Sequence, residues 1–192
     1  MSDTPNDFLS DPAEEGRLQA LGQRFFLALE ALRALRTDDA AELLRGVLRE
    51  EPRLPEPHME LSRILLEAGQ LDEALEHAEE AVRLLDAGGQ WIDDLAENEV
   101  QSLAWNLKAE VLRLQADSDE VVFGDPAVWA DLMKQSKEAF AKAADLDPNN
   151  RHADHWGHHL GDGEEEAEGG ADDGELDALL GVGERRLPVG EA

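Results

Sequence analysis

The stretch HMELSRILLEAGQLDEALEHAEEAVRLLD, residues 58–86, contains two short helical patterns separated by a glycine. In each pattern, apolar residues recur every three or four positions, which is the spacing of one helix face. Gly69 stands just past the first pattern, where a helix commonly ends in a residue with left-handed backbone. The stretch therefore predicts a helix over 55–68, a tight turn, and a second helix over 71–85.

Small and large residues alternate in this stretch in a fixed order. The ordered positions are His58, Leu61, Ser62, Leu65, Ala74, Ala78, Ala81 and Asp86. Small residues let two paired helices approach closely, and large apolar residues fill the space between successive pairs. A single pair cannot bury its apolar face, so about three pairs must stack to form a stable domain.

The same order recurs elsewhere in the chain. About 34 residues earlier, the period of a known helical repeat, the positions hold Arg24, Leu27, Ala28, Ala31, Ala40, Leu44, Val47 and Pro52. A third copy is split by a long insertion and holds Trp105, Ala109, Leu112, Ser136, Phe140, Ala143 and Pro148. The chain thus contains three copies of one helix-pair pattern.

This pattern resembles the tetratricopeptide repeat over about residues 21–150. The small and large positions match, whereas His58, Ala78 and Asp86 replace the aromatic residues and the final proline of the family pattern. The resemblance implies an all-α fold, a right-handed stack of about three tetratricopeptide-like helix pairs. It also implies a non-enzymatic adaptor, scaffold or chaperone-like module that binds another protein.

Helical periodicity and start signals extend this prediction along the chain. Further helices are expected from Asp11-Pro12 to about Leu35, from Thr37 to Pro52, from near Trp91 to about Gln115, and from Asp125-Pro126 to Leu146. The expected divisions are a disordered N-terminus over 1–10, the repeat domain over 11–150, a capping segment over 151–160, and a disordered acidic tail over 161–192. Within the expected loop 116–126, Val121, Val122 and Phe123 either tuck onto the stack, which we favour, or form a docking patch.

The chain is strongly acidic, with 45 Asp and Glu against 17 Lys and Arg and a formal net charge of −28. Nucleic acids and anionic membranes would repel it, because binding them requires basic residues. A basic protein would be attracted, although adaptation to a salty cell interior explains the acidity equally well. The chain has no cysteine, no signal-like start and no run of about 20 apolar residues to cross a membrane. We therefore expect a cytoplasmic protein.

His152, His155 and His159 form the one constellation that resembles a metal site. Their spacing would place three imidazoles on one face of a helix, as a zinc or nickel site requires. Gly157 favours instead a short helix that caps the stack, with Trp156 covering apolar surface. No phosphate-binding glycine loop or catalytic triad order is visible. We therefore expect no enzyme activity, no cofactor and no metal, with the histidine site kept as a secondary possibility.

The resemblance also implies where a partner binds, because the first helix of each tetratricopeptide pair lines a concave groove. The implicated positions are Phe25, Leu29, Leu32, Arg33, Met59, Arg63, Leu66, Glu67, Asn106, Glu110 and Arg113. For the apolar members of this set, packing in the core is the alternative role. The Lys and Asn pattern with which some family members clamp a C-terminal carboxylate is missing, so that ligand is not expected.

A short leucine motif stands in the acidic C-terminal segment. Leu176, Leu179 and Leu180 fall at i, i+3 and i+4, so one helical turn would put them on one face. One turn is too short to be stable alone, which makes the motif useful only when a groove receives it, the chain's own or a partner's. Two other functions stay open, an acidic shield for a basic protein and metal handling through the histidines.

Overall fold

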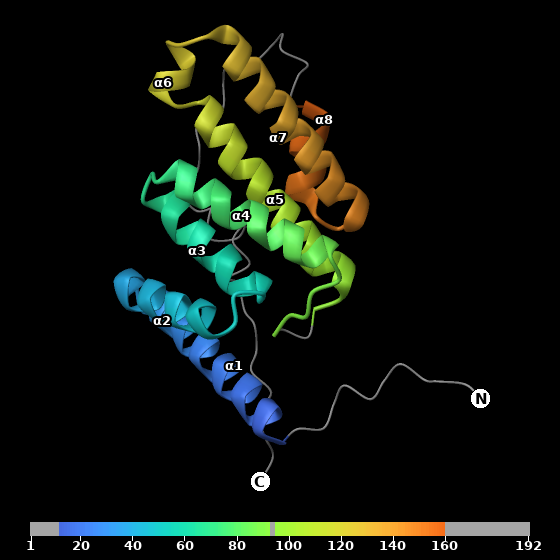
Figure 1. The fold of residues 1–192 in the computed structure, drawn as a ribbon. Helices are drawn as coiled ribbons and strands as arrows, with labels where there is room; N and C mark the ends of the chain where they lie inside the picture. The colour runs from blue at the N-terminus through green and yellow to red at the C-terminus, as the bar shows by residue number, and fades with distance from the viewer. Residues whose placement is uncertain (1–11, 93–94, 160–192) are drawn as a thin grey trace, which may run out of the picture.

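The computed structural model describes residues 12–92 and 95–159, and in this part of the chain it contains helices and no strand (Figure 1). The helices are α1 (Pro12–Arg33), α2 (Thr37–Glu50), α3 (Pro55–Glu67), α4 (Leu71–Asp86), α5 (Glu97–Ala116), α6 (Asp119–Val122), α7 (Pro126–Leu146) and α8 (Arg151–His159). The predicted all-α fold is confirmed. The expected disordered segments 1–10 and 161–192 lie outside the described residues.

Three helix pairs follow one another along the stack, α1 with α2, α3 with α4, and α5 with α7 (Figure 1). Successive pairs meet where α2 packs on α3 and where α4 packs on α5. The small positions of the repeat, such as Ala28, Ala40, Ala74 and Ala78, are fully buried. Because alanine adds no bulk, the helices of each pair approach closely, and the larger Leu61 and Leu65 fill the core beside them.

Three buried serines join the helices of the stack. The Ser62 hydroxyl of α3 donates to the Ala74 carbonyl of α4 at 2.7 Å. Between α5 and α7, Ser102 donates to the Ala143 carbonyl at 2.8 Å and Ser136 to the Ala109 carbonyl, also at 2.8 Å. Serine is small enough for these crowded positions, and each hydroxyl forms a hydrogen bond inside the core, as buried polar groups require.

The first helices of two pairs, α3 and α1, end in a left-handed residue, as does α4 at Gly88. Gly69 closes α3 with φ of 72°, and the Gln70 amide donates to the Leu65 carbonyl at 2.8 Å, as the sequence predicts for this turn. Leu35 closes α1 in the same way with φ of 56°, although it is not a glycine. The Arg36 amide then donates to the Ala31 carbonyl at 2.9 Å. Both turns fold the chain back for the second helix of the pair.

Three details of the helix starts can be compared with the prediction. Asp125 caps α7 as expected, because its Oδ1 accepts from the Ala127 amide at 2.9 Å ahead of Pro126 at the first helical position. The predicted start of a helix near Trp91 is wrong, since α5 begins at Glu97. Helix α2 begins at Thr37, as predicted. The segment expected as a loop over 116–126 contains the one-turn helix α6.

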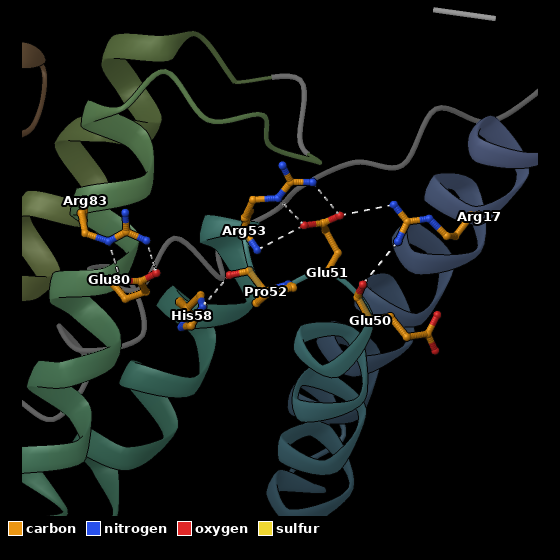
Figure 2. A network of polar contacts seen from close by, with 8 residues as sticks. All are labelled: Arg17, Glu50, Glu51, Pro52, Arg53, His58, Glu80 and Arg83. Atoms are coloured by element: carbon orange, nitrogen blue, oxygen red, sulfur yellow. Dashed lines mark hydrogen bonds and ion pairs between the residues drawn. The ribbon is translucent and has the colours of Figure 1, made fainter. Parts of the chain in front are cut away.

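A charged network fastens α1 to the turn between α2 and α3 (Figure 2). The Glu51 carboxylate, at the end of α2, forms ion pairs with the guanidinium groups of Arg53 at 2.8 Å and of Arg17 in α1 at 3.3 Å. The Arg17 side chain also donates to the Glu50 carbonyl at 3.3 Å. The hydrogen bond and charge of Arg53, supported by Arg17, lower the pKa of Glu51 to about 2 against the opposing effect of burial. The carboxylate is therefore held ionised beside two guanidinium groups.

Helix α8 packs on α7 at the end of the stack. Ala153 is fully buried, and Phe140 of α7 lies against the rings of His152 and Trp156 at centroid distances of 5.6 and 6.3 Å. The backbone of Gly157 runs close to α7, where a Cβ would meet the Ala141 backbone at 3.2 Å. Glycine at this position therefore allows α8 to lie tightly against the last pair.

Candidate functional site

The predicted groove residues on α1 and α3 divide into buried and partly open positions. Phe25 and Met59 are buried in two separate core clusters, so their side chains contribute packing and offer no surface to a partner. Leu29 and Leu32 lie half-buried against the first cluster, and Leu66 against the second. Two charged members of the set, Arg33 and Glu67, are exposed, and the third, Arg63, is half-buried with Glu60 at 3.4 Å.

The connector between α4 and α5 packs against the middle of α1 and the start of α3, which the sequence did not predict. Ile92 packs against the core cluster of Leu21, Val47 and Leu54, and its Cγ2 lies 3.7 Å from where a Cβ on Gly22 would stand. The Ile92 amide also donates to the Glu56 carboxylate at the start of α3. The connector therefore occupies the surface near the middle of α1 and at the start of α3.

The predicted groove residues of α5 meet α8. His152 of α8 hydrogen-bonds Glu110, and Arg113 donates to the same carboxylate at 3.0 Å. The Arg113 guanidinium lies 5.0 Å from the centre of the Trp156 ring. Burial would raise the pKa of Glu110, but the His152 hydrogen bond and the Arg113 charge outweigh it and hold that pKa below its usual value. Helix α8 thus engages part of the surface expected to receive a partner.

The histidines do not assemble into a metal site in the described part of the chain, where no three His, Asp or Glu side chains are grouped as a metal ion needs. His152 is used by Glu110, and the His155 ring stands edge-on to Trp156 with centroids 5.3 Å apart. The side chain of His159 lies outside the described residues. The geometry therefore gives the metal-handling function no support from His152 and His155.

A second pair of histidines, which sequence reasoning missed, joins α3 to α4. The Nδ1 atoms of His58 and His77 lie 2.8 Å apart, and His58 Nε2 is 3.1 Å from the Pro52 carbonyl (Figure 2 shows the His58 contact). Since a carbonyl only accepts, His58 donates from Nε2 and its Nδ1 accepts from His77. Burial lowers the pKa of both rings, and the nearby His58 adds to the lowering of the His77 pKa. The pair therefore favours neutral rings.

An open groove of about 800 Å³ lies between the α3–α4 turn and the segment formed by the end of α5, α6 and the start of α7. We call it the α6–α7 groove. Its apolar lining comprises Leu71, Val121, Val128 and Leu132, and its acidic lining comprises Asp72, Glu73, Glu120 and Asp125. Among the residues that line it there is no Lys or Arg.

Exposed apolar side chains stand in the same segment. Phe123 is 84% exposed, Val122 52% and Trp129 43%, so the expectation that Phe123 tucks onto the stack is wrong. The alternative of a docking patch, raised by the apolar character of 121–123, was the only sequence signal for this surface. The predicted leucine motif of Leu176, Leu179 and Leu180 lies outside the described residues.

No helix of the described residues is both long enough and apolar enough to cross a membrane. A comparison with curated proteins gave no match. Residues 31–84 match the family model described as tetratricopeptide repeat, a segment that runs from the end of α1 through nearly all of α4. Repeats of this family generally mediate protein–protein interaction and are typically not enzymes. Residues 31–84 are thus similar to tetratricopeptide repeats, and the stacked helix pairs of the described residues have the all-α, tetratricopeptide-like repeat fold.

Proposed function

We propose that this chain is a non-enzymatic adaptor or scaffold that holds a peptide or helix of a partner protein along α1, α3 and α5. The proposal rests on the partial burial of Leu29, Leu32 and Leu66. These leucines lie on the first helices and are only partly covered by the core. Half-buried leucines leave apolar surface that a partner's side chains can cover. The family match over 31–84 includes Leu32 and Leu66 and supports the same use.

Polar side chains beside these leucines would set the orientation of the partner. Arg33 and Glu67 are exposed and of opposite charge, and Arg63 and Asn106 lie half-buried on α3 and α5. Charged groups at the rim of an interface contribute more to specificity and association rate than to affinity. The partner segment would lie away from Leu21 and Gly22 in the middle of α1 and from the start of α3, because Ile92 packs there.

Photo-crosslinking in cells tests the proposal without disturbing the fold. A photoreactive amino acid replaces Leu32 or Leu66 in the full chain, and the matched control carries it at Leu35, which is 90% exposed and belongs to the α1–α2 turn. We expect the same partner to be crosslinked from positions 32 and 66 and not from 35. No adduct, or equal adducts from all three positions, would contradict binding along the first helices.

An acidic shield for a basic protein is a second candidate, favoured by the net charge of −28. Such binding depends on charge and should disappear above about 0.3 M salt, where screening shortens electrostatic interaction to a few ångströms. Binding to the leucines of α1 and α3 should persist at that salt concentration, because apolar burial is little affected by screening. The yield of the same crosslink, measured in a cell extract irradiated at low and at high salt, therefore separates the two candidates. A cytoplasmic location remains the expectation from the sequence.

A further inference from the structure

The α6–α7 groove is a second apolar surface, separate from the first helices used in the proposed function. Its lining combines the apolar Leu71, Val121, Val128 and Leu132 with the carboxylates of Asp72, Glu73, Glu120 and Asp125. Asp72 accepts a hydrogen bond from Gln115 at 3.0 Å and Asp125 caps α7, but in the described part of the chain none of the four carboxylates is ion-paired. The groove therefore fits a ligand with apolar side chains next to positive charge.

Trp129 and Phe123 are exposed apolar side chains that stand close in sequence to the residues lining this groove. They are 43% and 84% exposed, and they belong to the start of α7 and to the turn after α6, the same two segments that supply Val121 and Val128 to the groove. Contiguous exposed aromatic and aliphatic side chains commonly mark an interaction site. Covering them would remove apolar surface from water, which is the main favourable term in association.

The chain carries a segment of this chemistry beyond α8. Leu176, Leu179 and Leu180 are spaced for one helix face, and Arg185 and Arg186 follow them closely. These two arginines are the only basic residues among the 33 residues of 160–192, which hold 11 acidic ones. The stretch 176–186 thus combines the three leucines with two arginines and two acids, Asp177 and Glu184, and is net neutral within an otherwise acidic segment.

The length of chain between α8 and the leucines is sufficient to reach the groove. Gly157 lies beside Ala141 of α7, and Trp129 stands 12 residues earlier on the same helix, about 18 Å away at 1.5 Å per residue. The 16 residues of 160–175, treated as a random coil, have a root-mean-square end-to-end distance of about 20–24 Å. The distance and the reach therefore agree.

We propose that Leu176, Leu179 and Leu180 of the same chain occupy the α6–α7 groove, with Arg185 and Arg186 beside the carboxylates that line it. The leucines form one helical turn only when docked, because an isolated turn does not overcome the cost of helix nucleation. Tethering favours this occupant, since a short connection gives an effective concentration in the millimolar range. A second copy is disfavoured, because two chains of net charge −28 repel each other.

A paramagnetic label on the full chain tests the proposal. Because the chain has no cysteine, Gly183→Cys provides one attachment site for a nitroxide next to the motif. We expect backbone amide signals of residues 118–132 and 70–73 to lose most of their intensity. In the triple variant Leu176→Ser, Leu179→Ser and Leu180→Ser these signals should recover. The control variant Leu187→Ser and Val189→Ser changes apolar residues outside the motif and should leave the broadening unchanged.

Four results would overturn the proposal. The first is undiminished signal from the α6–α7 groove in the labelled chain, and the second is broadening that persists in the triple leucine variant. The third is broadening in a mixture of labelled, isotope-free chain with unlabelled, isotope-enriched chain, since that would place the motif in a second copy. Broadening confined to the amides of α1, α3 and α5 would likewise assign the tail to the other surface and refute docking at α6–α7.

Discussion

Leu35 ends α1 with φ of 56°, a backbone conformation in which its Cβ is crowded by the chain. The side chain is 90% exposed, so its packing offsets little of the free-energy cost of this backbone conformation. We predict that Leu35→Gly raises the free energy of unfolding by about 0.5–1 kcal/mol, because relief of the left-handed strain exceeds the greater freedom of glycine in the unfolded chain. Urea denaturation of the two proteins measures the difference.

The neighbouring substitution Ala34→Gly is the control. Ala34 is also exposed and does not have positive φ, so glycine relieves no strain there. The stability should fall by up to about 1 kcal/mol, the helix-propensity difference between alanine and glycine. Equal effects from both substitutions would mean that the turn after α1 does not depend on the conformation of Leu35.

The buried pair of His58 and His77 should make the fold sensitive to acid near neutral pH. Burial lowers both pKa values in the folded chain, so between the folded and unfolded pKa the unfolded state binds more protons. Stability is therefore complete above the unfolded pKa of about 6.5 and is lost as the pH falls below it. Thermal unfolding followed from about pH 7.5 to 5.5 should show a decreasing melting temperature.

Two variants assign this effect to the pair. The double variant His58→Gln and His77→Gln should show a flatter pH profile in this range, since the amides do not titrate. Glu51→Gln should leave the pH dependence of the melting temperature between about pH 7.5 and 5.5 unchanged. The lowered pKa of Glu51 gives stability that is present above about pH 4.5 and is lost only as the pH falls toward about 2. A profile that stays steep without both histidines would refute their role.

At the scale of helices, the sequence predicted those elements whose signals are local. Gly69 marks a turn because few other residues adopt its conformation, and Asp125 with Pro126 starts α7 through a cap and a fixed φ. The prediction of a helix start near Trp91 was wrong, because an apolar residue that packs in a connector cannot be distinguished in a sequence from one that begins a helix. Its indole donates to the Leu95 carbonyl at 3.1 Å, a contact that periodicity does not reveal.

The candidate site was less predictable than the helices. The repeat pattern identifies first-helix positions but does not say how deeply each is buried, so Phe25 and Met59 were included although both lie in the core. The coverage by Ile92 depends on a connector that folds back across 36 residues to Glu56. The α6–α7 groove is formed by an insertion outside the repeat pattern, so no regular position marks its lining.

Helix α6 and its turn should contribute little to stability, because their large apolar side chains are exposed. We predict that Phe123→Ser changes the free energy of unfolding by no more than about 0.5 kcal/mol, as is usual for a surface position. Phe140→Ala is the matched comparison in α7. Loss of this fully buried ring should lower the free energy of unfolding by about 3–5 kcal/mol. A loss of several kcal/mol for Phe123→Ser would show that its ring packs on the stack in solution.

At the scale of the whole molecule, acidity opposes folding. Ion pairs such as Arg17–Glu51 and Lys108–Glu79 neutralise a few carboxylates, but 45 acidic residues face only 17 basic ones. Bringing like charges together in a compact state costs free energy, which is the expense of high solubility. The question that follows is whether the acidity serves a partner or adapts the fold to a salty environment.

Salt dependence of stability answers it. We predict that the melting temperature rises between about 0.02 and 0.5 M NaCl, because screening weakens the many like-charge repulsions more than the few ion pairs. The double variant Glu73→Gln and Glu76→Gln removes two exposed like charges of α4 and should reproduce part of the rise at low salt. If the chain is folded at low salt and its melting temperature rises only modestly, it does not need a salty cell interior to fold. That result favours a partner-related use of its charge. A chain that folds only at molar salt indicates adaptation to the host, and a melting temperature that falls with salt would mean that the ion pairs outweigh the repulsion.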